Sequence, residues 1–171
     1  MTRQGASAPG TKRALLALAG ALLALAAMPA LAAAHHREIR VSGTYVPYDF
    51  GTTQCAPKGA SPDILTCSTT GFRSTYAGSL VGDVSTEFSN IINCKTGRTW
   101  GRGVETFTGS LNGSAPGTLT WKISFRSDFD CATSLPSGFK GRSHIKASSG
   151  ALAGIRGRLH FGDVTYDGVL R

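Results

Sequence analysis

The sequence predicts a secreted, disulfide-bonded, all-β protein, and three observations support this prediction. The chain begins with an apolar leader typical of exported proteins. All four cysteines lie beyond that leader. The rest of the chain shows the two-residue alternation of strands and lacks the 3.6-residue period of amphipathic helices. We expect a single antiparallel β-barrel, with a two-sheet β-sandwich as the alternative.

The leader covers residues 1–34 and is interpreted as a cleaved signal peptide, which leaves 35–171 as the β-barrel domain. Two basic residues precede an apolar run over 14–28, and a small-residue A-x-A sequence ends at Ala32. The run is shorter than the roughly 20 residues that a helix needs to cross a bilayer. We therefore expect cleavage near Ala32 or Ala34, an extracellular location and no membrane span.

Charge and composition give only weak functional information. The full chain carries 18 basic and 10 acidic residues, a net charge of +8. The leader contains three of the basic residues, so the mature chain has 15 against 10 and a net charge of +5. Such a charge favours anionic partners, but it also keeps a secreted protein soluble, and we adopt the second interpretation.

The four cysteines are Cys55, Cys67, Cys94 and Cys131. An even number in an exported chain indicates two disulfides, and no spacing resembles a zinc site. Four cysteines allow three pairings. In an antiparallel meander with short turns, the segments near Cys94 and Cys131 finish at the same end of the sheet. We therefore expect the pairs Cys94–Cys131 and Cys55–Cys67.

The strands are predicted from runs rich in Val, Thr, Ser and aromatic residues, in which apolar and polar positions alternate. In chain order, the positions expected on the apolar face are Ile39, Val41 and Tyr45; Val84, Thr86, Phe88 and Ile92; Leu119, Trp121, Ile123 and Phe125; Ile145 and Ala147; and Leu159 and Phe161.

Glycine-containing turns separate these runs, and two segments, 46–63 and 128–139, are expected to be irregular. The turn at 112–114 matches a glycosylation sequon but fits an Asn-Gly hairpin better. Glycines inside strands permit the bends that close a small barrel, which favours a barrel over a sandwich. These glycines include Gly43, Gly103, Gly141 and Gly157.

The last third of the chain resembles a known family. Residues 148–157 (SSGALAGIRG), 159–161 (LHF) and 166–168 (YDG) are similar to the closing hairpins of allene oxide cyclase-like barrels. They are equally similar to bacterial proteins with that barrel whose function is unassigned. Residues 105–109 (ETFTG) and 117–121 (GTLTW) fit the same pattern, so the resemblance covers roughly residues 75–171.

The resemblance implies an eight-stranded antiparallel barrel with a mostly apolar interior that can hold a small molecule. Plant allene oxide cyclases use such a cavity to steer an unstable oxylipin epoxide, so the resemblance implies an isomerase or cyclase as one possible activity. No catalytic residue of that family can be matched to this chain. The shared motifs indicate the fold but give little information about a reaction.

The function we expect is therefore the binding of a small apolar ligand in the barrel interior, without a cofactor or a metal. We expect a protein without enzymatic activity, with an isomerase or cyclase as the alternative. The residues expected to contact the ligand are Phe88, Phe107, Trp121, Ile123, Phe125 and Phe161.

Glu105 is a weak candidate for a catalytic acid or base. In one register it shares a strand face with Phe107, and burial there would raise the pKa of its carboxyl group. In the other register Val104, Thr106 and Thr108 point inward and Glu105 lies in water. We expect the solvated orientation.

Basic residues on the outer positions could form a stripe that attracts phosphate-bearing polymers. Few aromatic residues lie among them, so we expect no specific nucleic-acid binding and a solvated face balanced by Asp128, Asp130 and Asp163. The stripe comprises Lys122, Arg126, Arg142, His144, Lys146, Arg156, Arg158 and His160.

Other chemistries find little support. The chain has no G-x-S-x-G nucleophile motif and only one carboxylate that could face inward, whereas a glycosidase needs two. Asp128 and Asp130 are expected to form a loop edge, although they could bind a cation. Cleavage after Ala32 would expose an N-terminus with His35 at the third position, a chelator of Cu(II) or Ni(II), for which we expect no physiological role.

Overall fold

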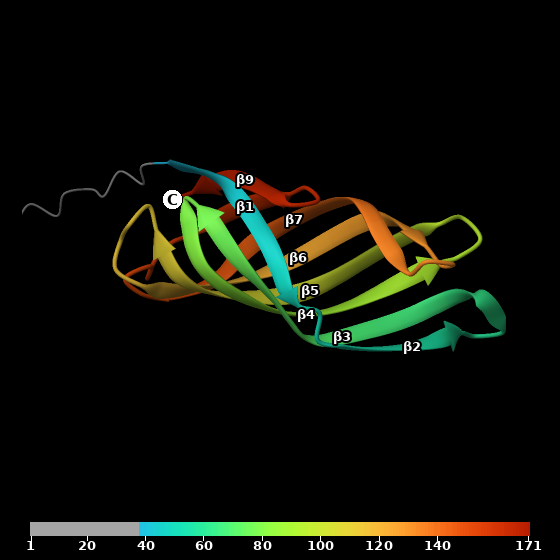
Figure 1. Cartoon of the computed structure of the whole chain (residues 1–171). Coiled ribbons are helices and arrows are strands. Elements are labelled where there is room, and N and C mark those ends of the chain that lie inside the picture. The colour runs from blue at the N-terminus through green and yellow to red at the C-terminus, as the bar shows by residue number, and fades with distance from the viewer. Residues whose placement is uncertain (1–37) are drawn as a thin grey trace, which may run out of the picture. The chain divides into compact units, whose positions relative to one another are not determined.

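The computed structural model describes residues 38–171, which form one antiparallel sheet of nine strands without a helix (Figure 1). The predicted signal peptide over 1–34 and the possible N-terminal chelator at His35 lie outside the described residues. The strands are β1 (Ile39–Asp49), β2 (Thr52–Lys58), β3 (Ser61–Gly78), β4 (Leu80–Asn93), β5 (Arg98–Leu111), β6 (Gly117–Asp130), β7 (Leu135–Gly150), β8 (Gly157–Phe161) and β9 (Thr165–Leu170).

Eight of the strands close into a barrel-like ring. The sheet order is β1-β9-β8-β7-β6-β5-β4-β3-β2, and β1 also pairs with β3, which closes the ring without β2. The prediction of an eight-stranded antiparallel barrel is therefore confirmed, and the β-sandwich alternative is wrong because one continuous sheet closes on itself. Strand β2 was not predicted; it pairs with β3 outside the ring.

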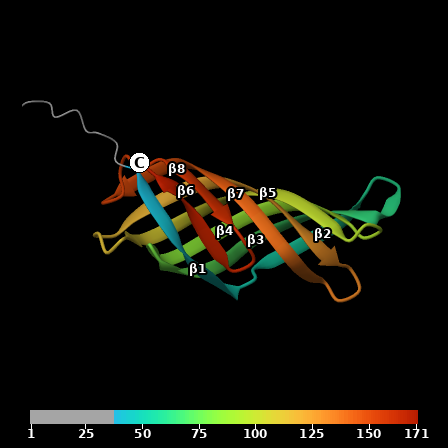
Figure 2. The ribbon, with the colours of Figure 1, turned by 90° about the horizontal axis from the view of Figure 1, so that it is seen from above.

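Strand β3 is long enough to pair with two partners in succession. Its C-terminal part pairs with β1, and its N-terminal part pairs with β2. The exchange occurs at Gly71, whose φ of +76° lies within a register irregularity between Thr69 and Phe72. Figure 2 shows β1 near the end of the ring where the chain terminates, with β2 continuing toward the opposite end.

The two segments predicted to be irregular are largely strand. Residues 46–63 complete β1, form β2 and begin β3, and residues 128–139 end β6 and begin β7. In the second segment, Asp130 pairs with Leu135 across a short turn. The prediction failed because these segments carry proline, cysteine and serine rather than alternating apolar residues.

The inward positions follow the predicted alternation except at Ala147, which is exposed. Trp121 pairs with Ile145, whereas Thr120 pairs with Ala147, so the register shifts between these pairs. The extra residue on β7 moves Ala147 to the outer face.

The end of the ring that holds the β3–β4 turn and the C-terminus is filled with side chains. The Tyr166 hydroxyl accepts a hydrogen bond of 2.7 Å from the backbone N–H of Leu80 and so satisfies a buried donor. Burial of the apolar side chains at this end supplies the main stabilisation of the ring. Side chains that are at most 2% exposed here include Leu80, Phe107, Leu119, Trp121, Leu152, Leu159 and Leu170.

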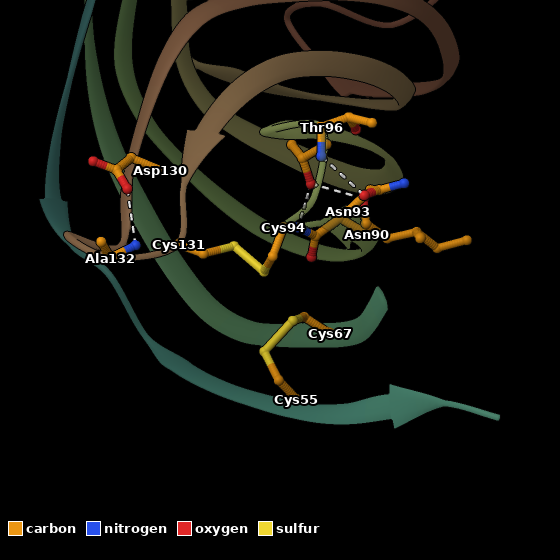
Figure 3. The surroundings of a disulfide bond; sticks show 11 residues. Cys55, Cys67, Asn90, Asn93, Cys94, Thr96, Asp130, Cys131 and Ala132 are labelled. Atoms are coloured by element: carbon orange, nitrogen blue, oxygen red, sulfur yellow. Dashed lines mark hydrogen bonds between the residues drawn. A yellow bond between two sulfur atoms is a disulfide. The ribbon is translucent and has the colours of Figure 1, made fainter. Parts of the chain in front are cut away.

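Two disulfides lie at the opposite end and confirm the predicted pairing (Figure 3). Cys55 and Cys67 face each other across the β2–β3 ladder, with their Cα atoms 4.1 Å apart. Cys94 and Cys131 join the β4–β5 turn to the β6–β7 turn. Two disulfides are compatible with an extracellular protein. Residues 38–171 contain no helix that is long and apolar enough to cross a membrane.

Candidate ligand-binding cavity

The half of the ring that carries the disulfides is hollow. A cavity of about 920 Å³ extends through it, lined by residues of β1 to β8 and of the turns that follow some of these strands. Small-molecule sites typically measure roughly 300–1,000 Å³. The space is therefore large enough for a ligand of drug-like or steroid-like size.

The hollow half exists because the C-terminal strands are short. Strand β8 ends where Phe161 pairs with Gly141, whereas β7 begins at Leu135. Among residues 38–171, the first residues of β7 therefore pair only with β6, and β2 pairs only with β3. At this end the sheet is an open trough whose two free edges are β2 and β7.

Five phenylalanines form a continuous arc along the wall of the trough. The ring centroids are 6.0 Å apart for Phe50 and Phe72, 6.1 Å for Phe72 and Phe88, and 5.5 Å for Phe88 and Phe125. Phe139 continues the arc at 5.5 Å from Phe125. The first three pairs are edge-to-face, an arrangement that stabilises aromatic clusters. An apolar ligand would meet ring surface on several strands at once.

Glycines on the inner face of β5 make room for this arc. A Cβ atom at Gly101 would lie 2.4 Å from Cζ of Phe125, and one at Gly103 would lie 2.7 Å from Cβ of Phe88. The neighbouring phenylalanines thus occupy the space that β5 side chains would otherwise fill. The glycines keep these rings against the wall and leave the lumen free.

A group of buried hydroxyl and amide groups shares the cavity with the rings. Thr99 donates from Oγ1 to the carbonyl oxygen of Ile91 at 2.8 Å and accepts from Nδ2 of Asn90 at 3.2 Å. The Oδ1 atom of Asn90 is buried without a hydrogen-bond partner among the described residues. A ligand that donates a hydrogen bond would satisfy this acceptor. The other buried polar side chains that line the cavity are Thr69, Ser74, Thr86 and Ser127.

Glu105 lies at the boundary between the packed half and the cavity. It lines the cavity but is only 9% exposed, so the expected solvated orientation is wrong. The indole N–H of Trp121 donates to its Oε2 atom, and the hydroxyl of Thr86 donates to its Oε1 atom at 3.3 Å. Burial raises the pKa of the Glu105 carboxyl group to about 7, although the two hydrogen bonds act in the opposite direction.

The same carboxyl group contributes to raising the pKa values of two tyrosines. Burial and the negative charge of Glu105 raise the pKa of Tyr45 and that of Tyr76 above the ordinary range for a phenol. Asp163 adds to this effect at Tyr45. Both phenols therefore stay neutral at physiological pH and can serve as hydrogen-bond donors. The Tyr45 hydroxyl already donates to the carbonyl oxygen of Gly162 at 2.6 Å.

The structure separates the six residues predicted to contact a ligand into two groups. Phe88, Ile123, Phe125 and Phe161 line the cavity. Phe107 and Trp121 are fully buried in the packed half and do not line it. Sequence reasoning missed Phe50, Phe72 and Phe139. The two-residue spacing of Phe72, Ser74 and Tyr76 on β3 was the signal that could have revealed Phe72.

The outer face of β6, β7 and β8 carries basic side chains in rows. Lys122, His144 and Arg158 are consecutive partners across the three strands, and a second row contains Arg142 and His160. All five are exposed. Together with Arg126 and Lys140, the second row lines a separate pocket on the sheet.

Two members of the predicted charge pattern, Arg156 and Asp163, lie elsewhere. Arg156 precedes β8 and exchanges backbone hydrogen bonds with Arg171 rather than joining a row. Asp163 lines the cavity and accepts a 2.6 Å hydrogen bond from the backbone N–H of Phe139, so it does not balance the outer face. The acidic neighbour of this face is Asp167, 3.6 Å from Nδ1 of His160.

Asp130 has a local structural role. Its carboxylate accepts a hydrogen bond of 2.8 Å from the backbone N–H of Ala132, which lowers the pKa of Asp130 (Figure 3). Asp130 thus ends β6 at the edge of the β6–β7 turn, as predicted, whereas Asp128 lies within β6 and pairs with Arg98 and Ser137. Within residues 38–171, no three His, Cys, Asp or Glu side chains lie close enough together to hold a metal ion.

Comparison with models of known protein families finds no match, and comparison with curated proteins also finds none. The resemblance to allene oxide cyclase-like barrels therefore stays a prediction from the sequence.

Proposed function

We propose that this chain is exported, loses its leader and binds a small, largely apolar molecule in the trough of the barrel. The observation that carries the proposal is the cavity of about 920 Å³ with a five-ring phenylalanine arc along its wall. Packed barrels fill such space with side chains. Here the inward glycines of β5 and the short C-terminal strands leave it open.

The proposal is tested with the secreted mature protein and the neutral fluorescent probe N-phenyl-1-naphthylamine. We expect saturable binding with a blue-shifted emission, because the probe moves from water into an apolar site. Replacing the buried Ser127 with phenylalanine should fill the cavity and abolish uptake. The same substitution at the exposed Ser124 of the same strand should leave binding intact.

A loss of probe binding by Ser127→Phe is informative only if this variant still folds. Circular dichroism and thermal unfolding are the measurements that check whether Ser127→Phe retains the sheet. If the wild-type protein takes up no probe, or if folded Ser127→Phe binds as well as the wild type, the cavity is not the binding site and the proposal is wrong.

An isomerase that acts on a bound ligand is the second candidate, and Glu105 is the observation that favours it. A carboxyl group with a pKa of about 7 at the edge of an apolar cavity is suited to proton transfer near neutral pH. Once a substrate is identified, Glu105→Gln should abolish turnover while leaving binding measurable. Undiminished turnover in that variant would exclude an acid–base role for Glu105.

A surface that binds anionic polymers is the third candidate, supported by the basic rows on β6 to β8. Heparin retention provides the test, with Arg142→Ser as the outer-face variant and Arg73→Ser on β3 as the control. We expect retention that falls steeply with salt and is weakened only by the first substitution. Retention unchanged by salt would contradict the electrostatic basis.

A further inference from the structure

We propose that the cavity selects apolar organic cations, with a protonated amine of the ligand held at Glu105 and its hydrocarbon part against the phenylalanine arc. This inference rests on the proposed function, because it specifies the ligand of the same cavity. Three features of the described residues lead to it: the sign of the charge inside, the unfilled hydrogen-bonding capacity of Glu105, and the aromatic wall.

The cavity and the outer surface carry charges of opposite sign. Among the described residues that line the cavity, the carboxylic acids are Glu105 and Asp163, and none is Lys, Arg or His. The mature chain nevertheless has more basic than acidic residues, and the exposed outer rows of β6 to β8 hold many of them. The electrostatic potential inside therefore favours a cation, although the whole molecule is positively charged.

Glu105 has no cationic partner within the described residues. Each of its carboxylate oxygens accepts one hydrogen bond, from Trp121 and from Thr86, and a carboxylate oxygen can accept a second. The other ionisable groups near it are the phenols of Tyr45 and Tyr76, which carry no positive charge. An ammonium group that lines up with the free lone pairs would supply both the missing donors and the missing charge.

The aromatic wall favours the same class of ligand. The faces of aromatic rings are negative and attract organic cations, most strongly where water is excluded. Phe88 and Phe125 line the cavity that Glu105 also lines. An alkyl or aryl ammonium ion would thus find apolar contact and favourable electrostatics in one space, whereas an apolar carboxylic acid would meet charge of its own sign.

The test compares two probes that differ only in charge. 1-Naphthylmethylamine is protonated at pH 8, and 1-naphthylmethanol is neutral and of nearly the same size. In calorimetric titrations of the mature protein at pH 8, we expect the amine to bind at least about tenfold more tightly than the alcohol, a difference of about 1.4 kcal/mol. At pH 5.5 Glu105 is protonated, and the preference should largely disappear.

Two variants localise the effect. Glu105→Gln keeps the size and a hydrogen-bond acceptor but removes the charge, so it should abolish the preference for the amine while still binding the alcohol. Glu87→Gln removes an exposed carboxylate from the outer face of β4 and should behave as the wild type. If Glu105→Gln fails to fold, the pH series on the wild-type protein decides the question.

The outcomes separate the two claims. If the alcohol binds and the amine has no advantage at pH 8, the inference is overturned and the proposed function stands. If neither probe binds, the proposed function fails, and the inference fails with it. If Glu105→Gln retains the full amine preference, the cation is bound elsewhere and the assignment to Glu105 is wrong.

Discussion

Trp121 and Glu105 face each other as a directly paired couple on β6 and β5, and the indole N–H of Trp121 donates to the Glu105 carboxylate. Trp121 is fully buried in the packed half of the ring, whereas Glu105 lines the cavity. The hydrogen bond therefore anchors an ionisable group where the packed core ends.

Glu105 should make the protein less stable as the pH rises. The pKa of its carboxyl group is about 7 when folded, against an ordinary value of 4.5, so the folded state holds the proton more tightly. The contribution of Glu105 to the free energy of unfolding is then fully present below pH 4.5. It decreases as the pH rises through 7, by about 3 kcal/mol in total. Urea unfolding of Glu105→Gln between pH 5 and pH 8 should lack this decline. Glu87→Gln should retain it, and a wild-type curve equal to that of Glu105→Gln would disprove the effect.

Replacing Trp121 with phenylalanine should destabilise the protein more at pH 8 than at pH 5. The substitution removes apolar volume and the N–H donor to Glu105 at both pH values, but a hydrogen bond to the ionised carboxylate at pH 8 is stronger than one to the neutral acid at pH 5. We expect a loss of roughly 3 kcal/mol at pH 8 and a clearly smaller one at pH 5. The same change at Trp100, which is 48% exposed, serves as the control and should cost less than about 1 kcal/mol at either pH. Equal losses for Trp121→Phe at both pH values would mean that the indole does not support the charged form.

Adding a side chain at Gly101 should close the cavity. A valine there would overlap Phe125 and Asn90, whose nearest atoms lie 2.4 and 2.7 Å from the Cβ position. We expect Gly101→Val to displace the Phe125 ring into the lumen, to cost roughly 1–3 kcal/mol and to abolish uptake of the neutral probe. Arg102→Val on the outer face of β5 should preserve uptake. Normal uptake by Gly101→Val would show that the arc can rearrange without loss of the site.

The two disulfides should contribute differently to stability and to binding. In the loop-entropy estimate, Cys94–Cys131 contributes about 4 kcal/mol and Cys55–Cys67 about 3 kcal/mol. Replacing the first pair with serine should lower the global unfolding midpoint. Replacing the second pair should weaken probe binding more than its smaller stability loss suggests, because β2 lines the cavity and, within residues 38–171, pairs with β3 alone. Unchanged probe binding in the variant that lacks the Cys55–Cys67 disulfide would show that β2 does not contribute to the site.

The sequence predicted the strands well where apolar side chains occupy the inner positions. On β6 the inward set of Leu119, Trp121, Ile123 and Phe125 is in place. On β5 the usual pattern is inverted, since its inward positions include Gly101, Gly103 and Glu105. Its outer face carries Trp100 and Val104, which are 48% and 44% exposed. A rule that places apolar residues inside therefore chose the wrong register for Glu105.

The phenylalanine arc and the hollow space could not be predicted, because they depend on how several strands combine and not on the residue pattern of any one strand. The phenylalanine arc combines residues from segments that were expected to be irregular, such as Phe50 and Phe139, with residues from β3, β4 and β6. The hollow space depends on the lengths of β8 and β9 relative to β7. Local alternation predicts which way a side chain points, but it does not predict whether the opposite wall is present.

The separation of charge between the lumen and the outer rows has a practical consequence for purification. The two carboxylates that line this trough, Glu105 and Asp163, disfavour the entry of long-chain fatty acids. Lipophilic bases, by contrast, should be carried through the early chromatographic steps and released when the solution is acidified. Mass spectrometry of an acid extract of the freshly purified protein therefore tests whether such a base is retained.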